Sequence, residues 1–233
     1  MSKLLCIETS TKNCSVALSL NGKVVVKEEH DANNFIHQER LHPLVQALLS
    51  EHSVALSEID AFAISLGPGS YTGLRIGVSA VKGFAFAMAK PVIAVPTLYH
   101  MARGCQMKFG NFKNFYPMID ARRMEVYSAE YSEDIALETE VKAVEIDEDS
   151  YASTKSNSVF FGDGAEKLSE VLQLPIEESP QAGSIIRNFQ ASASDLAVVA
   201  KEWYDQKRFV DLAYFEPYYH KDFVAGLPKK IFQ

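Results

Sequence analysis

The sequence predicts an α/β protein of two lobes, in which mixed sheets are flanked by helices. Three apolar, strand-like runs open the chain, at residues 3–8, 14–20 and 23–29. Helical and strand-like segments then alternate, which is typical of crossover connections. A polar, glycine-containing stretch follows at residues 105–114, and the pattern partly repeats after it. We therefore expect one lobe over residues 1–104 and a smaller lobe over residues 105–233, whose last helix or tail packs back on the first.

The first lobe begins with a predicted three-stranded meander. The dipeptide Asn21-Gly22 separates its second and third runs and is typical of a type I′ hairpin. A helix is expected over residues 35–52, because apolar residues recur there at steps of three and four. These residues are Leu41, Leu44, Val45, Leu48 and Leu49. Pro43 either kinks this helix or marks its start.

A glycine-rich segment, GPGSYTGLRIG at residues 67–77, lies between a predicted strand at residues 61–66 and a predicted helix. Glycines and a proline at the start of this segment continue neither a strand nor a helix, so a turn is forced there. We assign the turn to Gly67, Gly69 and Gly73. Ser70 or Thr72 is the expected cap of a helix that starts near Gly73 or Leu74 and ends near Lys90.

The remaining elements are shorter. A strand is expected at residues 92–95, followed by a helix at residues 97–104 with Thr97 as its cap. In the second lobe, the expected elements are a strand pair at residues 116–119 and 125–131, a strand at 159–161 and a helix at 194–204. Residues 138–149 are acidic and predict exposed loops or an edge strand.

Composition narrows the class of protein. The 233 residues are 47% apolar, which is enough for a core, and the net charge of −7 argues against a surface that neutralises many phosphates. The three cysteines show no metal-ligand spacing and suit a reducing compartment. The longest apolar stretch, residues 74–89, contains two basic residues and is too short for a bilayer. We therefore expect a cytoplasmic protein without membrane contact.

Several segments resemble the bacterial TsaB (YeaZ-like) family in order and spacing. Besides GPGSYTGLRIG, they are LLCIETSTKNCSVAL at residues 4–18, VIAVPTLYHMA at 92–102, PMIDARRMEVYSA at 117–129 and GDGA at 162–165. The resemblance implies the two-lobed fold that actin, hexokinase and the heat-shock chaperone ATPases share. It also implies a non-catalytic scaffold without a cofactor, which binds the catalytic subunit TsaD, joins TsaE in a larger complex and is required for threonylcarbamoyl transfer to adenosine 37 of tRNA. Because the chain is acidic, we expect tRNA contact only through the partner.

The expected docking surface lies on the helix that follows the glycine-rich segment. This helix is apolar or small nearly all the way round, so its outer side needs a cover. Gly77, Ala80, Phe84 and Ala87 follow steps of three and four, which permit close approach by another helix. The resemblance implies that TsaD contacts both N-terminal helices, which adds Leu41 and Leu44. Without TsaD, the same surface is expected to form a homodimer.

A small-molecule kinase of the same superfamily is the main alternative. Related kinases hold phosphates with two hairpin turns that need small residues. The first turn here, residues 8–11, carries hydroxyls, but the second, residues 120–123, carries Arg122 and Arg123 where related kinases have glycines. Gly162-Asp163-Gly164 resembles an adenosine-contacting turn. The hypothesis is a degenerate nucleotide site, so we assign no catalytic residue.

A metallopeptidase is a less favoured alternative. His37 and His42 lie close in sequence, but five residues along a helix place two side chains roughly 140° apart. A metal-binding pair on one helix face needs a four-residue step, and position 41 is a leucine. We therefore assign no metal ligand.

Overall fold

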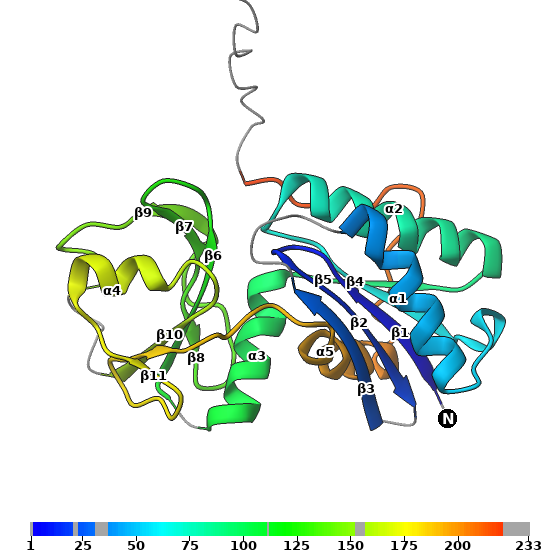
Figure 1. Cartoon of the computed structure of the whole chain (residues 1–233), viewed down its shortest axis with the longest axis horizontal. Helices are drawn as coiled ribbons and strands as arrows, with labels where there is room; N and C mark the ends of the chain where they lie inside the picture. Colours follow the sequence, from blue (N-terminus) through cyan, green and yellow to red (C-terminus); the bar gives the residue numbers. More distant parts are fainter. Residues whose placement is uncertain (1, 21–22, 31–36, 111, 152–156, 221–233) are drawn as a thin grey trace, which may run out of the picture.

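The computed structural model describes residues 2–20, 23–30, 37–110, 112–151 and 157–220, and Figure 1 shows two halves, each built on a sheet. The first sheet has five strands in the order β3-β2-β1-β4-β5. They are β1 (Lys3–Glu8), β2 (Asn13–Leu20), β3 (Lys23–His30), β4 (Ala61–Ser65) and β5 (Val92–Val95). The first three pair antiparallel, and β4 and β5 add in parallel to β1. The predicted meander with crossover helices is confirmed.

Helices cover both faces of this sheet. α1 (His37–Glu51) and α2 (Tyr71–Met88) pack on one face, and α5 (Ala193–Asp205) packs on the other (Figure 1). The alternation along β1 explains this arrangement, since successive side chains of a strand point to opposite faces. Leu5 and Ile7 belong to the core with α1 and α2, whereas Leu4 and Cys6 belong to the core with α5.

The second sheet follows the path β11-β12-β10-β6-β7-β9, with β8 paired to β6. Its strands are β6 (Asn114–Asp120), β7 (Glu125–Ser128), β8 (Tyr131–Ser132), β9 (Lys142–Glu145), β10 (Ser158–Phe161), β11 (Ile176–Glu177) and β12 (Ile185–Ile186). α3 (Thr97–Phe109) packs on one face, and α4 (Glu166–Leu172) packs on the other. The expected strand pair and the acidic edge strand are both present. The predicted α/β class with mixed sheets and flanking helices is therefore confirmed.

Two predicted helix boundaries and one predicted cap were wrong. α2 begins at Tyr71, two residues before Gly73, and the cap is Ser70, one of the two expected, whose hydroxyl accepts a hydrogen bond from the Gly73 backbone. α3 continues to Phe109 instead of ending at Gly104. Its cap position is Pro96, since the Thr97 hydroxyl accepts a hydrogen bond from the Gly67 backbone instead.

α1 begins at His37, so Pro43 lies inside it and does not mark its start. The Asn21-Gly22 turn and the residues before His37 lie outside the described part of the chain. A short 3-10 turn at Leu56–Glu58 leads into β4.

The chain returns to the first sheet after completing the second. α3 runs through residues 104 and 105, so the division between lobes at that point stays a prediction. α5 packs on β1, and Val210 forms a bridge with Val92 at the edge of β5. Within the described residues, no helix combines the length and apolar character that a membrane span requires.

Candidate functional site

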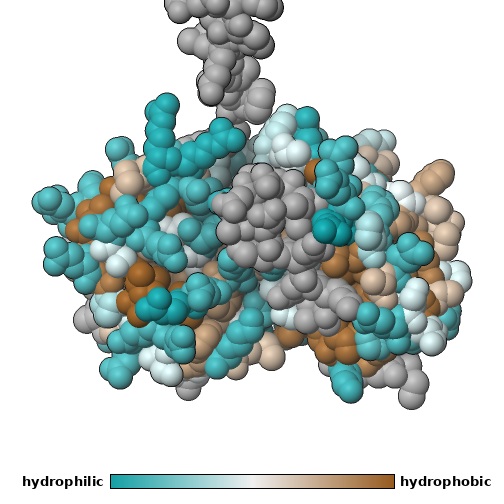
Figure 2. All heavy atoms as spheres, viewed as in Figure 1, coloured by the Kyte–Doolittle hydropathy of each residue, from teal (hydrophilic) through white to brown (hydrophobic). Residues whose placement is uncertain are grey.

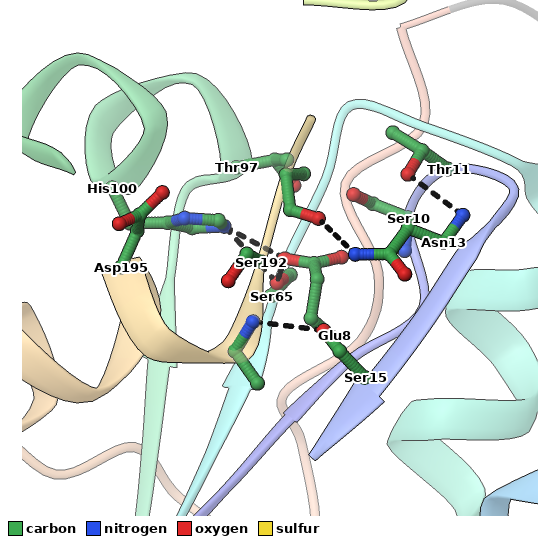
Figure 3. A network of polar contacts seen from close by, with 12 residues as sticks. Glu8, Ser10, Thr11, Asn13, Ser15, Ser65, Thr97, His100, Ser192 and Asp195 are labelled. Atoms are coloured by element: carbon green, nitrogen blue, oxygen red, sulfur yellow. Dashed lines mark hydrogen bonds and ion pairs between the residues drawn. The ribbon is translucent and has the colours of Figure 1, made fainter. Parts of the chain in front are cut away.

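A buried polar centre lies where β1 and β4 end beside α3 (Figure 3). Glu8 and His100 are fully buried, with 2.7 Å between Glu8 Oε2 and His100 Nε2. The Ser65 hydroxyl donates to the same carboxylate oxygen, and the Ser10 backbone N–H donates to Oε1 at 2.6 Å. Ser65 Oγ and His100 Nε2 are 3.2 Å apart. The centre therefore joins two strands of the first sheet to α3.

The electrostatics of this centre keep the Glu8 carboxyl ionised. Burial raises the pKa of Glu8, but hydrogen bonding and Coulombic attraction from His100 lower it, as do the hydrogen bonds from Ser10 and Ser65. The net effect is a pKa below the ordinary value of 4.5. The carboxylate is fully buried, and both of its oxygens accept hydrogen bonds from groups of the chain, which compensates the cost of burying its charge.

The turn after Glu8 is covered by the start of α2. A Cβ at Gly69 would overlap Ser10, and a Cβ at Gly73 or Gly77 would overlap Thr9. The Ser70 N–H also donates to the Ser10 carbonyl at 2.6 Å. The glycine spacing that the sequence shows therefore lets the first turns of α2 lie directly on this turn. A side chain larger than hydrogen would not fit at these three positions.

The second turn, between β6 and β7, is held by different contacts. Lys167 Nζ and the Arg122 N–H both contact Asp120 Oδ1. Arg122 and Arg123 have φ values of 69° and 48°, in the left-handed region that favours glycine. The Asp120 N–H donates to Asp163 Oδ1, and burial raises the pKa of Asp163 to about 6. The Asp120 carboxylate is thus paired with Lys167, and the long cationic side chains of Arg122 and Arg123 belong to the turn.

The two histidines weighed as metal ligands lie on different sides of α1. His37 is buried, and burial lowers its pKa. His42 is exposed, with its ring 5.7 Å from that of Phe84. Leu41, at the position that would complete a pair with His37, is fully buried in the core. Among the described residues, no group of three His, Cys, Asp or Glu side chains is placed to hold a metal ion.

The residues expected to dock a partner do not share one surface. Leu41, Leu44, Gly77 and Ala80 are buried in the core of the first sheet. Phe84 is partly buried, and its ring stacks on Phe62 with 5.8 Å between centroids. Ala87 is exposed. Their docking role stays a prediction, but most of this stripe already packs against the chain itself.

A different set of α2 residues faces outward, and we call it the outer stripe. It consists of Arg75, Ser79, Gly83, Phe86 and Ala87, which are all exposed. Phe86 exposes 81% of its surface, and a Cβ added at Gly83 would meet no described atom within 4 Å. Figure 2 shows white to brown atoms over the side of the molecule that carries α1 and α2. Of the residues expected to dock a partner, Ala87 belongs to the outer stripe, whereas the sequence pattern did not single out Phe86, which lies about half a turn from Phe84.

Two mixed sheets, each with helices packed on both faces, define an α/β protein. A family model described as "TsaD: tRNA N6-adenosine threonylcarbamoyltransferase" matches residues 34–216. The chain is 32% identical over 232 residues to the tRNA threonylcarbamoyladenosine biosynthesis protein TsaB of Escherichia coli (strain K12), with 96% of each chain covered. The Haemophilus influenzae TsaB is 36% identical over 124 residues, which are 53% of this chain and 51% of that protein.

Solved structures agree with these relatives. YeaZ from Pseudomonas aeruginosa matches with a TM-score of 0.78 and 29% identity, covering 94% of this chain and 100% of that one. The chain belongs to the TsaB (YeaZ) family. It therefore takes part in the biosynthesis of tRNA threonylcarbamoyladenosine.

Proposed function

We propose that this chain is a non-catalytic, cytoplasmic scaffold that binds a TsaD subunit through the outer stripe of α2 and the neighbouring α1. Binding would favour the arrangement of TsaD that transfers the threonylcarbamoyl group to adenosine 37 of tRNA, which is a population shift. TsaE would join the larger complex, and tRNA would be held by the partners. The observation that carries the proposal is a helix that exposes Gly83, Phe86 and Ala87 beside one another.

The family match supports the choice of partner. A model built for the threonylcarbamoyltransferase covers the residues of α1 and α2, so the transferase is expected to carry an equivalent helix pair. Two related chains with equivalent helices can pair about a pseudo-twofold axis, since each offers the same kind of face. The same reasoning supports a homodimer when TsaD is absent. Gly83 provides the close approach and Phe86 the apolar contact.

We base the proposed absence of catalysis on the structure of two turns, one in each sheet. The turn at Thr9 and Ser10 is covered by α2, and the turn at Asp120 carries two arginines. A kinase of this superfamily needs both turns to be open to the phosphates of ATP. We therefore expect the purified chain to transfer no phosphate. ATP hydrolysis by the chain alone would favour the kinase alternative.

Light scattering after size-exclusion chromatography tests the proposal directly. The chain is mixed with TsaD of the same organism, and the molar mass is compared for the unaltered chain, Phe86→Glu and Gly83→Glu. We expect a heterodimer with the unaltered chain and none with either variant. Both sites are exposed, so the folded state tolerates the charge.

Leu137→Glu is the matched control. Leu137 exposes 54% of its surface, but it lies in the half of the molecule that carries the second sheet. The control should bind TsaD as the unaltered chain does. Failure of the unaltered chain to bind, or unchanged binding by Phe86→Glu and Gly83→Glu, would overturn the proposal.

A further inference from the structure

The segment of residues 210–220, which we call the C-terminal strap, runs beside α2 in the direction opposite to the helix. Lys82 Nζ donates to the Ala213 carbonyl at 3.3 Å and lies 4.6 Å from the centre of the Phe215 ring. About two and three turns toward the start of α2, Arg75 and Tyr71 contact Tyr219. Figure 1 shows this red segment against the helix. The strap thus contacts both halves of α2.

The strap also seals the start of the glycine-rich segment. The Tyr218 N–H donates to the Leu66 carbonyl at 2.7 Å. A Cβ at Gly67 would lie 2.6 Å from the Tyr218 carbonyl oxygen, and the φ of Gly67 is +115°. Gly67 is therefore needed both for the backbone conformation of the turn and for the passage of the strap above it.

The end of the strap is built into the exposed surface of α2. The Arg75 guanidinium lies 4.1 Å from the centre of the Tyr71 ring and 5.8 Å from that of Tyr219. Arg75 Nε donates to the Tyr219 hydroxyl at 3.1 Å, and the two tyrosine rings are 4.9 Å apart. An arginine held against two aromatic rings loses little further freedom when a partner binds.

The position of these contacts on the helix decides their role. With 3.6 residues per turn, Tyr71, Arg75 and Lys82 lie on one flank of α2, and Phe84 lies on the flank that contacts His42 of α1. Ser79, Gly83 and Phe86 lie between the two flanks. The outer stripe is therefore bordered by α1 on one side and by the strap on the other.

We infer that the C-terminal strap is part of the docking surface: it fixes the N-terminal half of α2 and presents Arg75 and Tyr219 to the TsaD subunit. The inference rests on the proposed function, since it assigns a further contact to the same interface. Because Tyr219 contacts Arg75 of the outer stripe, the strap and the stripe form one continuous surface, which supports a single partner for both. Tyr218 exposes 60% of its surface beside them and adds apolar area to the contact.

Affinity measurement by isothermal titration with TsaD of the same organism tests the inference. Tyr219→Ala removes the ring and the hydrogen bond, and we expect it to weaken binding at least tenfold. Tyr219→Phe retains the ring and should lose less than Tyr219→Ala. Tyr214→Ala is the matched control, because Tyr214 lies in the same strap, is 84% exposed and makes none of these contacts; its affinity should stay within twofold.

Amide hydrogen exchange of the free chain separates positioning from docking. Tyr219→Ala should speed exchange in the first two turns of α2 without lowering the global unfolding midpoint. If Tyr219→Ala bound TsaD within twofold of the unaltered chain and its exchange were unchanged, the inference would be overturned. The proposed function would still stand in that case if Phe86→Glu lost binding. If the unaltered chain bound no TsaD, the proposed function and the docking role of the strap would both fail.

Discussion

The inner and outer faces of α2 carry the same kinds of residue, but the inner face is packed against the chain and the outer face is exposed. On the inner face, Gly73 and Gly77 lie against Thr9, and no side chain larger than hydrogen fits. On the outer face, Gly83 faces no described atom, and Phe86 is almost fully exposed. The inner glycines bring the helix close to the first turn of the sheet. The outer glycine makes no such contact within the described chain.

The difference teaches that small residues in a helix are not by themselves a docking signal. Steps of three and four predict a close approach, but they do not say whether the approaching element belongs to the same chain. The close approach on the inner face places the start of α2 directly on the turn that follows Glu8. The outer face is the part of α2 that the described chain leaves exposed.

The largest expected effect lies below the inner face, in the buried polar centre. Glu8→Ala would leave the Ser10 N–H, the Ser65 hydroxyl and the His100 ring without their acceptor in a fully buried site. Breaking a buried ion pair by removing one partner costs about 3–5 kcal/mol, and we expect the free energy of unfolding to fall by that amount. Urea denaturation at neutral pH, followed by fluorescence of the single tryptophan, Trp203, measures it.

Glu145→Ala, on the exposed edge strand β9, is the control and should change stability by less than about 0.5 kcal/mol. The pH dependence gives a second check. The folded-state pKa of Glu8 is depressed, so its stabilising effect is complete above an ordinary value of 4.5 and is lost as the pH falls through the folded-state pKa. Glu8→Gln should therefore flatten the fall in stability below that pH. Equal slopes for both proteins would contradict the assignment.

Gly73→Ala tests the contact of the inner face with the first turn. The added methyl group would overlap the Thr9 carbonyl oxygen, which belongs to the backbone and cannot rotate away. Overpacking of this kind costs about 1–3 kcal/mol, and we expect the upper half of that range. Thermal denaturation measures the loss. If the melting temperature were unchanged, α2 would not lie directly on the turn.

A pair of charged substitutions compares the two faces most directly. Ala80 is buried against α1, so Ala80→Glu should lower the free energy of unfolding by about 2 kcal/mol. Gly83→Glu, three residues along the same helix, should not lower stability, because the site is open and glutamate is a better helix former than glycine. Chemical denaturation of both variants under one condition gives the comparison. Equal losses would show that the two faces do not differ in burial.

The fold followed from the sequence more fully than the site did. The order of strands and helices along the first sheet was readable, because apolar strand-like runs and apolar residues at helical spacing are local signals. Ser70 was one of the two expected caps of α2, and the start of the helix was placed two to three residues late. The sequence did not indicate which face of α2 is exposed, because a helix that is apolar on nearly all sides has no polar face to mark the solvent side. A return of the last helix or tail to the first lobe was expected, but the individual contacts of the strap with α2 span more than 130 residues and no local pattern specifies them.

Gly83→Ala is the smallest expected change and the one that separates stability from function on the outer face. Glycine in a helix interior costs about 1 kcal/mol relative to alanine, and no described atom lies within 4 Å of the new Cβ, so the variant should be more stable by about that amount. If a TsaD helix approaches closely at Gly83, the same methyl group should weaken binding. Denaturation and titration of one variant would then move in opposite directions, because the chain retains a destabilising glycine where the partner needs the space. A rise in stability with unchanged affinity would place the partner elsewhere on α2.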